Sequence, residues 1–199
     1  MTFEKRDTSK DKTRAWAEIS RPALLNNVEV VRSHLGPETT MAAVVKADAY
    51  GHKVGLVAPI LEKEAGVRFF AVATLEEAIE LRELGIRSDI LILASVDPRY
   101  VPELKHYNLI VTIMDQLYVG PYARMAAKSE GALRLHLKLD TGMTRLGLST
   151  REEELEQSLA VARAIEEMPQ LQLEGVFSHL ASGAADPDFS KRQLDLYHS

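Results

Sequence analysis

The sequence predicts an α/β fold in which parallel strands alternate with helices. Apolar runs with the length and composition of buried strands lie at residues 41–46, 68–73, 89–94, 109–114, 133–140 and 171–180. Segments with apolar residues at helical spacing separate them, and strict alternation of this kind implies right-handed crossovers between parallel strands. An open doubly wound sheet and a (β/α)8 barrel both have this pattern.

Two observations favour the barrel and limit its size. No G-x-G-x-x-G or P-loop pattern follows any of the runs, and such a pattern is the main positive signal for a nucleotide-binding open sheet. A closed barrel needs eight units and about 250 residues, whereas this chain has 199 residues and ends within a predicted helix. We therefore predict a TIM-type (β/α)8 barrel that is truncated after about six β/α units.

The first elements and one later helix are predicted from short patterns. Brief alternation of apolar and polar residues predicts a strand at 15–20, and apolar residues at helical spacing predict a helix over 21–35. A weaker helix over 115–129 is interrupted by Gly120 and Pro121. The interruption predicts a break in this helix.

Two further helices begin with a capping signature. Thr74 and Glu77 form a capping box, and Gly85 can end the helix that follows. Thr150 and Glu153 repeat the signature before a second amphipathic segment. We predict that each threonine is the N-cap residue of its helix.

Composition and charge limit the function classes. A net charge of -5 with both signs interspersed gives no basic patch, which argues against a nucleic-acid partner. The absence of cysteine excludes disulfides, thiolate metal sites and a thiol nucleophile, and we predict no metal. No apolar run is long enough to span a bilayer. We predict a cytoplasmic protein with a flexible polar leader over 1–14, one barrel domain over 15–199 and no membrane partner.

Polar residues stand at or just after the ends of three strand-like runs. Lys46 ends the first, Lys138 and Asp140 end the fifth with Arg145 close behind, and His179 lies near the end of the last. In a barrel such ends converge on one face, where sites form. Taken singly, each has an ordinary alternative, such as a lysine stem on apolar surface or a hydrogen-bonded core histidine. Their arrangement favours a shared site.

Lys46 is the strongest candidate for chemistry. Desolvation at the end of an apolar strand lowers the pKa of a lysine, and a neutral amine can attack a carbonyl to form a Schiff base. Asp48, Tyr50 and His52 add donors and acceptors in the turn that follows. Pyridoxal 5'-phosphate (PLP) is the common aldehyde partner of such a lysine.

Several stretches together resemble the N-terminal part of alanine racemase, a PLP enzyme of bacteria: WAEIS, AVVKADAYGH, FAVATLEEAIELRELGI, KLDTGMTRLG and FSHLA. The resemblance covers residues 14–199. It implies the (β/α)8 barrel of that family without its C-terminal β domain. The family usually has glycine after the histidine of the AYGH stretch, whereas this chain has Lys53.

The resemblance also implies roles for the candidate residues. Lys46 forms the Schiff base with PLP and is one of two catalytic bases, and Tyr50 binds the cofactor phosphate. Arg145 contacts the phenolic oxygen of PLP and the substrate carboxylate, and Lys138 is a lysine that carbamylation makes negative so that it orients Arg145. His179 lies near the cofactor ring, in the hydrogen-bond network of the second base.

The implied reaction is the interconversion of L-alanine and D-alanine by a homodimer, which supplies D-alanine for peptidoglycan. The second base is a tyrosine from the C-terminal β domain of the partner subunit, so we expect this chain alone to be inactive. Two alternatives stay open: a racemase of another small amino acid such as serine, and a non-enzymatic barrel that handles PLP homeostasis.

Overall fold

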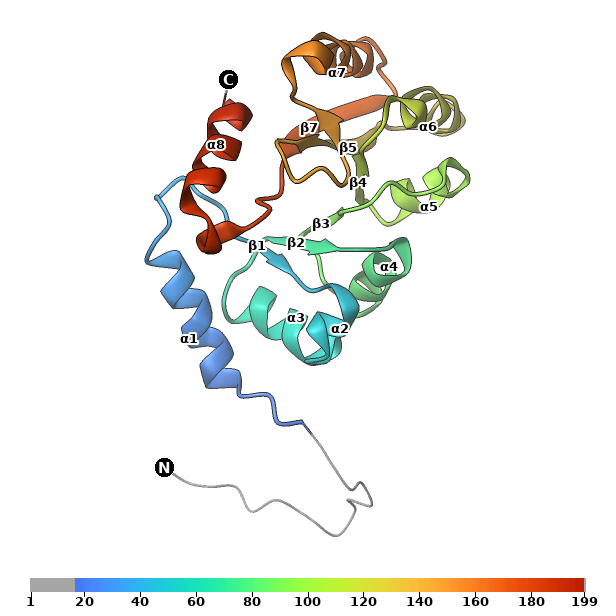
Figure 1. Cartoon of the computed structure of the whole chain (residues 1–199). Helices are drawn as coiled ribbons and strands as arrows, with labels where there is room; N and C mark the ends of the chain where they lie inside the picture. The colour runs from blue at the N-terminus through green and yellow to red at the C-terminus, as the bar shows by residue number, and fades with distance from the viewer. Residues whose placement is uncertain (1–16, 199) are drawn as a thin grey trace, which may run out of the picture.

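The computed structural model describes residues 17–198, which form the predicted α/β fold (Figure 1). The leader predicted over 1–14 lies outside the described residues. All pairs of strands in the sheet are parallel, in the order β1-β2-β3-β4-β5, and β7 pairs with β5. The short β6 pairs with the last two residues of β5. The parallel α/β class is therefore confirmed.

The strands differ in length, from two residues in β6 to eight in β5. They are β1 (Ala42–Val44), β2 (Phe69–Val72), β3 (Asp89–Ile92), β4 (Ile110–Ile113), β5 (Leu133–Asp140), β6 (Leu148–Ser149) and β7 (Leu171–Phe177). Each matches one of the apolar runs in the sequence, apart from β6. From β1 to β5, strands that are consecutive in the sequence are also neighbours in the sheet.

Helices connect the strands, and α3 to α7 form an arc around the sheet in Figure 1. The α-helices are α1 (Arg21–Arg32), α2 (Lys46–Tyr50), α3 (Val54–Lys63), α4 (Leu75–Glu83), α5 (Val101–His106), α6 (Val119–Ala126), α7 (Glu152–Glu166) and α8 (Pro187–His198). Short 3-10 turns lie at Pro98–Tyr100, Gln116–Tyr118 and Gly183–Ala185. Over residues 17–198, no helix combines the length and apolar character that crossing a membrane requires.

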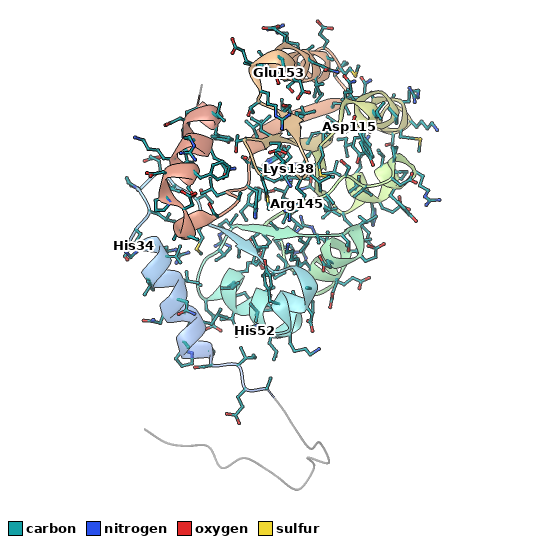
Figure 2. The ribbon with its side chains drawn as sticks, viewed as in Figure 1. His34, His52, Asp115, Lys138, Arg145 and Glu153 are labelled. Atoms are coloured by element: carbon teal, nitrogen blue, oxygen red, sulfur yellow. The ribbon has the colours of Figure 1, made fainter. Side chains whose placement is uncertain are left out.

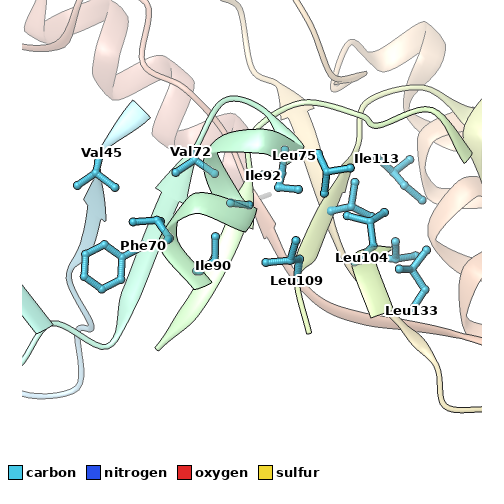
Figure 3. Close-up of a cluster of buried hydrophobic side chains, with 14 of the residues drawn as sticks. Val45, Phe70, Val72, Leu75, Ile90, Ile92, Leu104, Leu109, Ile113 and Leu133 are labelled. Atoms are coloured by element: carbon cyan, nitrogen blue, oxygen red, sulfur yellow. The ribbon is translucent and has the colours of Figure 1, made fainter. Parts of the chain in front are cut away.

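The main hydrophobic core lies between the sheet and the helices (Figure 3). Phe70, Ile90 and Leu133 are fully buried there, and burying a side chain of this size contributes about 1.5–3 kcal/mol. Because side chains alternate along a strand, Ala71 and Leu91 belong to a second, smaller cluster. The sheet therefore has apolar contacts on both faces.

Strand β5 shows how the alternation places a charged residue. Leu135 and Leu137 belong to the main core, whereas the intervening His136 contacts Phe69 on the second face, with ring centroids 5.9 Å apart. Lys138 follows at the same spacing, so its side chain belongs to the second face as well. This face is the one on which the candidate site forms.

Three local predictions from the sequence are wrong. Residues 17–20 form no strand, because Ser20 instead caps α1 by accepting a hydrogen bond from the Ala23 N–H at 3.3 Å. Thr150 does not cap α7, since its hydroxyl donates to the Asp140 carbonyl at 3.0 Å. Gly120 and Pro121 do not break a helix, because they lie in the first turn of α6.

The capping box at α4 is confirmed. The Glu77 N–H donates to the Thr74 hydroxyl at 3.3 Å, and the Glu77 carboxylate accepts from the Thr74 N–H at 3.3 Å. Gly85 follows the helix with a φ of 84°, a conformation that favours glycine. The sequence therefore predicted both ends of this helix correctly.

Candidate active site

The structure brings the sequence-predicted residues together at the carboxyl ends of β1, β5 and β7. Lys46 follows β1, Lys138 lies on β5, Arg145 lies in the loop after β5, and His179 follows β7. Desolvation of the His179 ring, followed by the positive charges of Arg145, Lys138 and Lys46, lowers the pKa of this histidine. The predicted convergence of strand ends therefore occurs.

Lys138 is the most buried member of this cluster, at 6% exposed. Burial lowers its pKa, as do the charges of Arg145 and Lys46, against the opposing effect of Asp140. Its Nζ lies 5.9 Å from the centroid of the Phe177 ring. Figure 2 shows Lys138 and Arg145 near the centre of the molecule, within the arc of helices. A buried cation beside other cations is costly, so the cluster favours either an anion or a neutral Lys138 amine.

Lys46 is only partly buried, which is less than its apolar context in the sequence suggested. Before it, the Val45 N–H donates to the Ala71 carbonyl of β2 at 2.9 Å, which continues the strand pairing. After it, the chain enters α2, where the Ala49 N–H donates to the Val45 carbonyl at 2.9 Å. The lysine therefore occupies the junction between a strand and a turn.

The turn after Lys46 is left-handed. Ala47, Asp48 and Ala49 all have φ of 53°, and Tyr50 follows with φ of 54°. Left-handed helical conformation costs about 1–2 kcal/mol per non-glycine residue because Cβ approaches the following carbonyl oxygen. Interactions from outside the turn must offset this strain. The turn leaves Tyr50 59% exposed, so its hydroxyl is free to meet a ligand.

Asp48 and its neighbours stabilise the end of this turn. One Asp48 carboxylate oxygen accepts from the Val54 N–H at 2.8 Å and the other from Lys53 Nζ at 2.7 Å. The hydrogen bond from Lys53 and that from Val54 lower the pKa of Asp48. His52 Nδ1 lies 3.1 Å from the Ala49 carbonyl. Asp48 therefore connects the turn to the segment that follows it, and His52 contacts a carbonyl of the turn itself.

Lys53 has φ of 69°, in the left-handed region that favours glycine. A glycine would adopt this conformation without strain. The Lys53 side chain forms an ion pair with Asp48, which attaches the strained residue to the turn.

Asp140 organises the loop that carries Arg145. Its carboxylate accepts from the N–H groups of Gly142 and Thr144, each at 2.9 Å, and from that of Arg145 at 3.1 Å. Burial opposes ionisation, but these hydrogen bonds outweigh it and lower the pKa of Asp140. Thr144 has φ of 56°, so the loop also contains a strained residue. Arg145 is thus positioned through its own main chain.

We predict that Asp140→Asn loosens this loop, because an amide has one acceptor oxygen where the carboxylate serves three N–H groups. The expected cost is about 1–3 kcal/mol of unfolding free energy, with faster amide exchange at Gly142, Thr144 or Arg145. The matched control is Asp115→Asn, because Asp115 accepts from the Leu117 N–H with one oxygen and asparagine can replace it. Equal effects of the two changes on the loop amides would contradict the role.

The lowered pKa of Asp140 also gives a pH dependence. Its stabilising effect is present above the ordinary aspartate value of 3.8 and is lost as the pH falls below that value through the pKa of the folded state. Loop amides should therefore exchange faster, relative to their intrinsic rates, only in this acidic range. The Asp140→Asn chain should lack this transition.

A side-chain network that sequence reasoning missed holds the segment containing His179. Gln193 of α8 is 1% exposed, and its Nε2 donates to the His179 carbonyl at 3.2 Å and to Thr141 Oγ1 at 3.3 Å. Thr141 also contacts the Ser178 hydroxyl, at 2.7 Å. The network therefore joins the loops after β5 and β7. A glutamine in an amphipathic helix carries no sequence signal for such a role.

Comparison with known proteins shows the family to which this chain belongs. Residues 19–199 match the family model described as "Alanine racemase, N-terminal domain". The chain belongs to the alanine racemase N-terminal domain family. Among its relatives, alanine racemase of Synechocystis sp. is 41% identical over 176 residues, which cover 88% of this chain and 45% of that protein. The serine/alanine racemase of Enterococcus gallinarum is 39% identical over 169 residues, 85% of this chain and 22% of that protein.

A solved structure supports the same assignment. The crystal structure of alanine racemase from E. faecalis superposes with a TM-score of 0.80 at 36% identity, over 90% of this chain and 47% of that one. This alanine racemase family chain therefore has the fold of the N-terminal barrel domain, as predicted. It spans less than half the length of the alanine racemases of Synechocystis sp. and E. faecalis.

Proposed function

We propose that this chain is the PLP-binding barrel part of an amino-acid racemase that interconverts L-alanine and D-alanine, in the cytoplasm, for peptidoglycan. The observation that supports this most is the cluster of Lys46, Lys138, Arg145 and His179 at the strand ends of an alanine racemase family domain. Each of these residues lies in or next to a stretch whose sequence resembles that family. The activity belongs to the protein that contains this chain.

The residues of the cluster fit PLP. The cofactor is an anion that carries an aldehyde, and the site offers a lysine amine together with two further cationic side chains. Lys46 would bind the aldehyde carbon, Tyr50 the phosphate, and Arg145 the phenolic oxygen. When bound, PLP supplies a ring that delocalises the electrons left by a deprotonated Cα.

In this proposal the residues of the chain divide the remaining work. Lys46 removes or returns the Cα proton on one face of the substrate, and Arg145 holds the substrate carboxylate through paired hydrogen bonds. Lys138 becomes carbamylated, and its lowered pKa favours the neutral amine that carbon dioxide requires. The negative carbamate then orients Arg145, and His179 belongs to the network of the second base.

Racemisation needs a base on each face of Cα, and the second base is proposed to be a tyrosine from the C-terminal β domain of the partner subunit. The enzyme is then a homodimer, and residues 1–199 alone form no D-alanine. This division agrees with the length of the relatives, of which the chain covers less than half. Cofactor binding and turnover can then be measured separately, because the proposed second base is not part of residues 1–199.

A second candidate is a racemase that also acts on serine. The relative from Enterococcus gallinarum carries the name serine/alanine racemase, and it is nearly as similar to this chain as the alanine racemase of Synechocystis sp.. The shared barrel therefore does not by itself select the amino acid. A PLP-homeostasis barrel without turnover is the remaining alternative.

The test is to purify the whole protein that contains this chain, load it with PLP and measure formation of D-alanine and D-serine from the L-amino acids. Faster turnover of alanine supports the proposal, and faster turnover of serine supports the second candidate. Bound PLP with no turnover of either amino acid would leave only the homeostasis alternative. Residues 1–199 assayed in parallel should produce neither D-amino acid.

A further inference from the structure

We propose that Glu77 is a positioning residue for Lys46: its carboxylate holds the left-handed turn that fixes the main chain of this lysine. The proposal rests on the proposed function only in making Lys46 the PLP anchor. The hydrogen bonds by which Glu77 holds the turn are present in the chain without cofactor. Glu77 lies in the first turn of α4, and α3 and β2 separate this helix from the α2 turn that begins with Lys46.

The hydrogen bonds of Glu77 carry this inference. One carboxylate oxygen accepts from the Ala47 N–H at 2.7 Å, and the other accepts from the Ala73 N–H at 2.7 Å. Ala47 directly follows Lys46, and Ala73 directly follows β2. A single carboxylate therefore joins the carboxyl ends of β1 and β2 at the candidate site.

The bond to Ala47 meets a specific need. The N–H groups at the start of a helical turn have no acceptor within the turn and must find one elsewhere. Here the turn is also left-handed, so it lacks the intrinsic stability of a right-handed helix. A charge-assisted hydrogen bond at its first left-handed residue is the contact that offsets this deficit most directly.

Lys46 is held from both sides as a result. The preceding residue, Val45, donates its N–H to β2, and the following residue, Ala47, donates its N–H to Glu77. The main chain on either side of the lysine is thereby attached to neighbouring elements. The side chain of Lys46 therefore starts from a fixed main-chain position, which lowers the entropic cost of orienting its amine toward a ligand.

The same carboxylate also completes the capping box of α4, so a purely structural role must be separated from positioning. Thr74→Ala makes this separation, because it removes the bond from the Glu77 N–H and leaves the Glu77 carboxylate beside Ala47. Glu76→Ala is a second control, because Glu76 is an exposed acidic residue in the same first turn. Both controls keep the contact on which the proposal depends.

The first measurement is amide hydrogen exchange at Ala47 in residues 1–199 without PLP. Glu77→Ala should speed exchange at Ala47 by at least about tenfold, whereas Thr74→Ala and Glu76→Ala should change it much less. Global stability is measured for all three chains, so that exchange can be compared at equal free energy of unfolding. Unchanged exchange at Ala47 in Glu77→Ala would overturn the proposal, as would an equal increase in Thr74→Ala.

The second measurement follows the reactivity of the lysine. Each chain is mixed with PLP and reduced with borohydride at intervals, and the pyridoxyl label is quantified on Lys46 relative to Lys53. Glu77→Ala should lower this ratio by at least about tenfold, with Thr74→Ala near wild type. An unchanged ratio in Glu77→Ala would overturn the positioning role. If even the wild-type chain leaves Lys46 unlabelled, the proposed function fails, while exchange at Ala47 still decides whether Glu77 holds the turn.

Discussion

Lys46→Ala is expected to abolish the specific attachment of PLP to this chain. The reason is that the amine proposed to react is removed, and the other lysine of the cluster, Lys138 of β5, is only 6% exposed. In the proposed function Lys46 is one of two bases, so in the whole protein we expect the same change to lower turnover by about 10²–10⁴-fold. Borohydride reduction followed by peptide mapping measures the attachment, and D-alanine formation measures the turnover.

The matched control is Lys53→Ala, because Lys53 is an exposed lysine directly after the same turn. Its loss removes the ion pair with Asp48 and leaves the amine of Lys46 in place. Specific labelling should therefore remain. A pyridoxyl group on Lys138 or Lys53 in the wild-type chain, with Lys46 unmodified, would show that the anchor was assigned to the wrong residue.

Gly147→Ala is expected to be the most destabilising single change in the loop that carries Arg145. A Cβ at this position would lie 2.8 Å from the Asp140 N atom and 2.9 Å from the Leu139 carbonyl carbon, both in the backbone of β5. Gly147 also has φ of 132°, which side chains rarely adopt. Backbone strain and overpacking cost about 1–3 kcal/mol each, so we expect a loss of roughly 2–6 kcal/mol.

Urea unfolding of the wild-type and variant chains measures this loss. Gly131→Ala is the control, because Gly131 has φ of 78° but no atom within 4 Å of the added Cβ. It carries conformational strain without a steric clash, and should cost about 1 kcal/mol. Similar losses of unfolding free energy for the two variants would mean that β5 and the loop can move apart at no energetic cost. That result would contradict the close approach of Gly147 to the β5 backbone.

Hydrophobic pattern alone determined the class of fold. The runs that became β2, β3 and β4 are continuously apolar because both faces of the sheet are covered there, and this property is local enough to read along the chain. The capping box of Thr74 and Glu77 was equally readable, since all its atoms lie within one turn. The identical signature at Thr150 failed because a distant acceptor, the Asp140 carbonyl, took its hydroxyl.

The sequence also determined which residues would meet, because parallel strands place their carboxyl ends on one side of the sheet. That rule groups Lys46, Lys138 and His179 from the sequence alone. The proposal that they form a racemase site came from the resemblance to a family, and residues 19–199 match the model of that family.

Only the tertiary structure decided how these residues are held. The left-handed turn after Lys46 has no signature in a run of alanine, aspartate and tyrosine, since it is disfavoured locally and persists through contacts made elsewhere. Glu77 lies 30 positions from Ala47, and Gln193 lies 52 positions from Thr141. Hydrogen bonds over such separations depend on where the folded chain places the two groups, and so they become visible only after the sheet and helices have packed.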